Sequence, residues 1–174
     1  MTDRRFFGTN KLVDDYTTNL DKVETLDGGW TIKYVDKLNN KEWLKYSVDP
    51  DRGYHFNLML TTPRLTTKEI IDVAFNSQHS DEVSAAAYRL NLEEQDERKE
   101  YREDLLKRLT EIPIDNLDKL EKERLRTIIQ AGQLADNVNM RVKVGNTLEQ
   151  IKRDSEFFDR VSSKAKKLLD LLNE

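Results

Sequence analysis

Residues 30–60 contain three runs in which large apolar side chains alternate with polar ones, and this pattern constrains the fold more than any other feature of the chain. A period of two places the apolar residues on one face of a β-strand. The runs consist of Trp30, Ile32 and Tyr34, of Leu44, Tyr46 and Val48, and of Tyr54, Phe56, Leu58 and Leu60. Because short turn segments join them, we expect a three-stranded antiparallel meander.

Turn chemistry supports the same interpretation. Asn39-Asn40 separates the first two runs, and asparagine tolerates the backbone angles of a turn. Asp49-Pro50-Asp51-Arg52-Gly53 separates the second and third, with proline suited to the second position of a turn and glycine to its close. The chain should therefore reverse direction twice between residues 30 and 60.

A small sheet with an apolar face needs a covering layer, and the residues after 60 are predicted to supply one. Thr66-Thr67-Lys68-Glu69 reads as a capping box, in which a threonine oxygen and Glu69 satisfy free backbone N–H groups at a helix start. Apolar residues then recur at helical spacing. The predicted helices span 66–76, 80–92, 96–111, 116–131 and about 146–172. The fold class is therefore α+β, a small N-terminal meander at about 30–60 packed against a mostly helical remainder that can form helical hairpins.

The remaining segments complete the predicted organisation. Residues 1–10 read as a loose end, and residues 11–25 as a short amphipathic helix. In residues 134–144 the apolar positions fit both a strand and a helix, and we favour a helix because the surroundings are helical. We divide the chain into an α+β domain at 1–112 and a helical extension at 113–174 that packs on the same core.

Composition excludes several classes of function. The net charge is −4, and charged residues make up 36% of the chain, so the basic surface needed for broad nucleic-acid binding is not expected. The absence of cysteine excludes disulfides and thiolate sites. No apolar run reaches about 18 residues, and no secretory signal is evident, so we expect a cytoplasmic protein without a membrane segment.

The sequence contains no recognisable reaction centre. His55 and His79 are the two histidines, and neither has a second histidine nearby. The carboxylate pairs are most simply solvated helix faces, and neither a phosphate-binding loop nor a nucleophile elbow is present. We therefore predict no catalytic residues, no cofactor and no metal site. A hydrolase whose site forms from scattered carboxylates is an alternative.

A binding surface is the remaining candidate, because tryptophan, tyrosine and arginine are the usual anchors of protein interfaces. Most of the rings in residues 30–60 are expected in the core. Trp43 is out of step with its run, so it should lie on the opposite face or at the strand start, and it is the ring with the weakest case for burial. The predicted partner-binding residues are Trp43, Asp49, Asp51, Arg52, Tyr54 and His55.

Several segments carry a resemblance to a known group of proteins. The quoted segments are G-W-T-I-K-Y-V-D from Gly29, E-W-L-K-Y-S from Glu42, P-R-L from Pro63, S-D-E-V-S-A-A-A-Y-R-L-N-L-E-E from Ser80 and E-Y-R-E-D-L-L-K-R-L from Glu100. Over residues 27–111 the chain resembles small bacterial immunity proteins of polymorphic toxin systems. The resemblance implies a non-catalytic protein that binds one cognate toxin in the producing cell's cytoplasm.

Two further expectations concern partners. An acidic protein can meet a basic toxin, because opposite charge speeds their encounter. The alternative partner is a second copy of the chain: the apolar stripe of residues 147–172 would then form a homodimer, as in a self-associating structural or scaffolding protein of a phage or mobile element.

Overall fold

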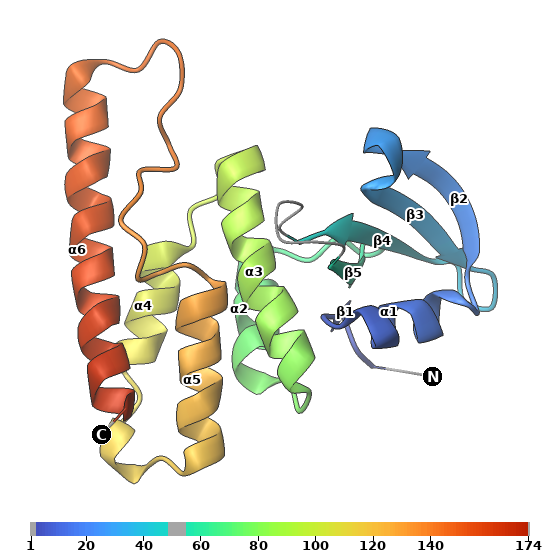
Figure 1. Ribbon diagram of the computed structural model, residues 1–174, viewed down its shortest axis with the longest axis horizontal. Coiled ribbons are helices and arrows are strands. Elements are labelled where there is room, and N and C mark those ends of the chain that lie inside the picture. Colours follow the sequence, from blue (N-terminus) through green and yellow to red (C-terminus); the bar gives the residue numbers. More distant parts are fainter. Residues whose placement is uncertain (1–2, 49–54, 174) are drawn as a thin grey trace.

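The computed structural model of the protein describes residues 3–48 and 55–173, and within these it combines an antiparallel sheet with six α-helices. Figure 1 shows the sheet at one end of the molecule, α2 and α3 beside it, and α4, α5 and α6 beyond them. The elements are β1 (Phe6–Phe7), α1 (Asn10–Thr17), β2 (Asp21–Leu26), β3 (Thr31–Asp36), β4 (Lys41–Ser47), β5 (Phe56–Leu60), α2 (Thr67–Asn76), α3 (Ser80–Glu97), α4 (Arg102–Thr110), α5 (Lys119–Ala131) and α6 (Leu148–Asn173). The predicted α+β class is confirmed.

The described part of the sheet has five strands in the order β1-β5-β4-β3-β2, and each neighbouring pair is antiparallel. Strands β3, β4 and β5 form the predicted meander. The prediction was incomplete, because β1 and β2 extend the meander at its two edges. Alternation divides β4 between two faces: Leu44 and Tyr46 pack with the helical core, whereas Trp43 packs in a second cluster on the opposite face.

The helix predicted over residues 11–25 is wrong beyond Thr17, where α1 ends. The hydroxyl groups of Thr17 and Thr18 donate hydrogen bonds to the carbonyl oxygens of Asp14 and Asp15. Such side-chain bonds compete with the helical ladder and favour its end. Residues 21–26 then pair with β3 as β2, with a bulge at Val23.

The N-terminal segment is not loose from Arg4 onward, which corrects the prediction for residues 1–10. Phe6 and Phe7 are buried, and they pair with Met59 and Leu58 of β5. The backbone N–H groups of Arg5 and Phe6 both donate to Oε1 of Glu82, at 2.6 and 2.9 Å. Helix α3 therefore holds β1 in place through a buried carboxylate.

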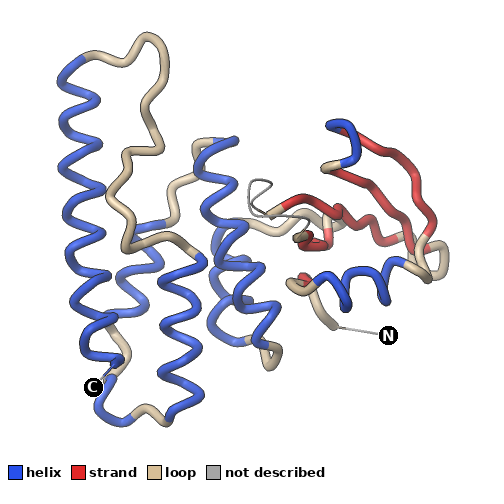
Figure 2. The backbone as a smooth tube through the Cα atoms, viewed as in Figure 1, coloured by secondary structure: helices blue, strands red, loops and turns tan. Residues whose placement is uncertain are grey.

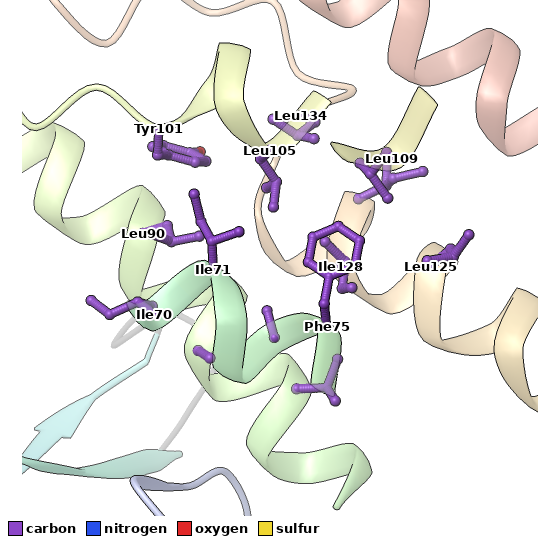
Figure 3. Packing of buried hydrophobic residues seen from close by; sticks show 14 of the residues in the cluster. Ile70, Ile71, Phe75, Leu90, Tyr101, Leu105, Leu109, Leu125, Ile128 and Leu134 are labelled. Carbon is purple, nitrogen blue, oxygen red and sulfur yellow. The ribbon is translucent and has the colours of Figure 1, made fainter. Parts of the chain in front are cut away.

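One buried cluster connects the sheet to all the later helices. It begins with Phe6, Tyr46 and Met59 on the sheet and continues through α2 and α3. Figure 3 shows how Ile71 and Phe75 of α2 face Leu105 and Leu109 of α4 across this cluster. The same cluster includes residues from both sides of position 113: Leu125, Ile128 and Ile129 of α5, and Val161, Ala165, Leu168 and Leu172 of α6.

The helix boundaries differ from the predicted ones at specific residues. The capping box of α2 is present, with Thr66 and Glu69 in the expected roles. Helix α3 runs to Glu97 rather than to 92, and it ends at Arg98, whose backbone is left-handed at φ 59°. As a result α4 starts at Arg102, later than predicted. Asp118 forms a second capping box with Glu121, so α5 starts at Lys119.

The helix favoured for residues 134–144 is absent from the structure, which is described throughout this segment and has turns and irregular chain there. Oδ1 of Asp136 accepts the N–H of Val138, and Oδ1 of Asn139 accepts the N–H of Arg141, each at 2.9 Å. These local bonds occupy N–H groups that a helix or a strand would need. The apolar spacing in this segment is therefore not evidence of regular structure.

Candidate functional site

The helices cover only part of the sheet. Helices α2 and α3 pack on one face, while the aromatic cluster under α1 fills the other around β4 and β5. Strand β2 is exposed at five of its six residues and half-buried at Leu26. Figure 2 shows β2 and β3 reaching away from α2 and α3. We call these two strands the open half of the sheet.

A groove of about 370 Å³ lies between the start of β3, the C-terminal half of β4 and α3. The β3–β4 register places Thr31 opposite Tyr46, and the N–H of Ser47 donates to the carbonyl of Trp30 at 3.0 Å. These strands form one wall, and the C-terminal half of α3 forms the other. The lining residues are Trp30, Thr31, Leu44, Tyr46, Ser47, Arg89, Leu92 and Asp96. The groove is thus formed by two elements that are far apart in the sequence.

Arg89 is fixed in the wall of this groove. Its guanidinium group lies 5.6 Å from the centre of the Tyr46 ring and pairs with Glu93 at 3.2 Å and Glu97 at 3.6 Å. Burial raises the pKa of the Tyr46 hydroxyl to about 12, so the ring stays neutral near pH 7. The groove therefore presents a rigid aromatic wall and an arginine whose charge is already balanced.

Asp96 differs from the other acidic side chains at the C-terminal end of α3. Glu93 pairs with Lys99 at 2.9 Å, and Glu94 pairs with Arg102 at 2.6 Å. Within residues 3–48 and 55–173, the Asp96 carboxylate has no hydrogen bond or ion pair, and its side chain is exposed. It is the carboxylate in the groove that remains available to a partner.

The acidic residues of α3 hold the molecule together. The Asp81 carboxylate forms an ion pair with Arg4 and accepts a hydrogen bond from the N–H of Gly8. The Glu94 carboxylate forms ion pairs with both Arg102 and Arg141. Among the described residues, no group of three or more His, Asp or Glu side chains is arranged to hold a metal ion. The observed role of these carboxylates is to bind cations of their own chain.

Trp43 is not a surface residue, which corrects its assignment to a partner-binding site. Its side chain is 1% exposed and packs at 5.8 Å from the Phe7 ring and 4.9 Å from the Tyr16 ring, between centroids. The reason is α1, which carries Tyr16 and covers the face of the sheet opposite α2 and α3. The expectation that Trp43 lies on the face opposite Leu44 is confirmed.

His55 is exposed, and its Nε2 lies 3.0 Å from the carbonyl oxygen of Gly8. It adjoins Val48, whose N–H donates to its carbonyl. Trp43 lies five residues further along β4, which corresponds to about 17 Å. The structure therefore does not bring Trp43 and His55 together. The other predicted partner-binding residues, Asp49, Asp51, Arg52 and Tyr54, lie outside the described residues.

Sequence reasoning missed the helical wall of the groove. Arg89, Leu92 and Asp96 are spaced by three and four residues, so they share one face of α3. That spacing was a usable signal. It did not identify the face, because the same helix also carries buried residues all around its N-terminal half.

Comparison with protein-family models, with curated proteins and with solved structures finds no match for this chain. Within the described ranges, each helix is too short or too polar to cross a lipid bilayer. The fold and the groove are therefore the observations from which a function can be argued.

Proposed function

We propose that this protein is a non-catalytic binding protein that binds and neutralises a cognate bacterial toxin. The observation that carries the proposal is the groove between strands β3 and β4 and helix α3. It exposes Trp30 beside Arg89 over the buried ring of Tyr46, and tryptophan and arginine are enriched at the energetic centres of protein interfaces. A concave surface with a rigid aromatic wall can receive a projecting element of a partner with little loss of conformational freedom.

Two sequence features agree with this proposal. Every residue that lines the groove lies within residues 27–111, the part of the chain that resembles immunity proteins. Residues 67–97 carry eight acidic and two basic side chains. The excess of acidic over basic side chains in this segment is therefore larger than the excess in the whole chain, whose net charge is −4. A basic toxin would be attracted to this region at long range.

The test is co-expression of the tagged protein with the product of the neighbouring reading frame. We expect recovery of a stoichiometric complex, and rescue of growth when that product is toxic. Trp30→Ala combined with Leu92→Ala should weaken the complex by about tenfold to a hundredfold, the usual effect of removing interface anchors. Isothermal titration calorimetry would measure the loss of affinity.

Leu38→Ala provides the matched control, because Leu38 is 93% exposed between β3 and β4 and does not line the groove. It should bind as the wild type does. Equal losses for both variants would place the partner elsewhere on the sheet. Recovery of the protein alone would instead favour the self-associating structural role, and hydrolysis that depends on a divalent metal would favour the hydrolase.

A further inference from the structure

Exposed apolar side chains gather in one segment of the chain that does not line the groove. The described residues include nine large apolar side chains that are exposed, and four of them lie in a stretch of eleven residues: Val138, Val142, Val144 and Leu148. We call residues 136–151 the arm. Figure 1 shows it as the loop after α5 and the first turn of α6, at the end of the helical layer away from the sheet. Exposed apolar patches of this kind mark interaction sites.

The exposure of these valines results from a defined conformation. Arg98 donates to the carbonyl of Met140 at 2.8 Å. Arg141 pairs with Glu94 at 3.1 Å and with Glu100 at 3.2 Å, and its guanidinium lies 4.4 Å from the centre of the Phe157 ring. The Arg141 side chain thus faces the protein and, together with Arg98, holds the backbone of the arm, while the valines are left exposed.

The apolar stripe of α6 itself is largely used within the chain. Phe158, Val161, Ala165 and Leu172 are buried against the other helices. Leu148, at the start of the same helix, is 85% exposed. Contact between two copies through the whole of residues 147–172 would require the bundle to open. The first turn of α6 and the loop before it remain accessible.

Two unpaired charges of opposite sign flank the two most exposed apolar residues of the arm. Lys143 precedes Val144, and Glu149 follows Leu148. Both charged side chains are exposed, and in the described part of the chain neither has a hydrogen bond or an ion pair. A patch that carries both signs on either side of an apolar centre is complementary to itself under a two-fold rotation.

We propose that the arm is a homodimer surface, in which two copies meet about a two-fold axis. Val144 and Leu148 of each copy pack against those of the other, and Lys143 of each pairs with Glu149 of the other. Because the proposed contact rests on four residues of each copy, whereas a standard interface takes about 20–30 residues a side, we expect the dimer to form at tens to hundreds of micromolar concentration.

Sedimentation equilibrium between about 1 and 300 µM would test the proposal, because the predicted association lies in this range. The wild type should shift from monomer to dimer. Val144→Asp combined with Leu148→Asp should raise the dissociation constant at least tenfold. Leu120→Asp, at an exposed leucine of α5, should leave it unchanged. Circular dichroism would verify that each variant is folded.

A charge exchange makes the test specific to the proposed pairing. Lys143→Glu and Glu149→Lys should each weaken the dimer, because each places like charges opposite one another twice. An equimolar mixture of the two variants should restore association, because both pairs become complementary. A wild type that stays monomeric to 300 µM, or a mixture no stronger than its components, would overturn the proposal. The four substituted residues do not line the groove, so toxin capture should not depend on either result.

Discussion

The two edges of the sheet are built in opposite ways. Strand β1 has two residues, both buried, and its backbone is held by a carboxylate of α3 that lies 76 residues away in the sequence. Strand β2 has six residues, mostly exposed, and its ion pairs are made with the adjacent strand, as between Lys33 and Glu24. A short edge is stable here because distant residues fix it, whereas a long edge is stable through pairing with its neighbour.

The covered edge and the open half of the sheet also have different roles. The covered edge contributes to stability, and it tolerates little change because its surroundings are fully packed. The open half contributes area that a partner can contact. Substitutions should therefore have very different effects at the two edges, and the following predictions run from the largest expected effect to the smallest.

Gly8→Ala should destabilise the covered edge most. A β-carbon at this position would lie 2.2 Å from the carbonyl oxygen of Asp81, which is backbone and cannot rotate away. We expect a loss of about 3 kcal/mol or more in the free energy of unfolding, measured by urea denaturation. Thr25→Ala on exposed β2 is the control and should change stability by less than about 1 kcal/mol. Similar losses of stability for the two variants would contradict the expectation that the two edges of the sheet differ in their tolerance of substitution.

Glu82→Ala should come next. The change removes the acceptor of the Arg5 and Phe6 N–H groups, and the hydroxyl of Ser77 also donates to this carboxylate, at 2.6 Å. Only the Phe6 bond is fully buried, and a buried donor left without an acceptor costs about 1–3 kcal/mol, so we expect a loss of about 2 kcal/mol. Hydrogen exchange should show faster exchange at Phe6 and Phe7. Glu24→Ala removes an exposed carboxylate and should have little effect on either measurement.

Tyr46 offers a smaller and pH-dependent test at the boundary between the covered and open halves. Burial raises its pKa to about 12 from the usual value of 10. The unfolded chain therefore releases this proton first, and the stability present below pH 10 should fall as the pH rises towards 12. Thermal unfolding between pH 9 and 12 would show the decline. Tyr46→Phe should make it shallower, and an unchanged slope would contradict the assigned burial.

The parts of the fold that sequence predicted are those set by local chemistry. The alternation of Trp30, Ile32 and Tyr34 and the capping box at Thr66 and Glu69 depend on residues close to one another in the chain. The position of Trp43 depends on α1 and on Phe7, which were assigned to a helix of the wrong length and to a loose end. The packing of one face of β4 could not be predicted without knowing which elements cover the other.

The groove, too, could be predicted from the sequence only in part. The strand wall follows from the meander, but its second wall requires the crossing of α3 over the sheet. That crossing is fixed by the close approach at Gly8 and by the bonds of Asp81 and Glu82 to the N-terminal segment. A glycine in a polar N-terminal stretch gives no sign of such a contact. The site could therefore be predicted in part, from the residues of one wall.

The hold of Glu82 on β1 has a consequence for biosynthesis. Phe6 leaves the ribosome 76 residues before its acceptor. At about 5–20 residues per second, that separation corresponds to roughly 4–15 s of translation. The meander is complete only once Leu60 has been made, and the carboxylate that holds β1 follows later, at Glu82. We therefore expect the first strand of the chain to be the last to join the sheet, after α3 has emerged.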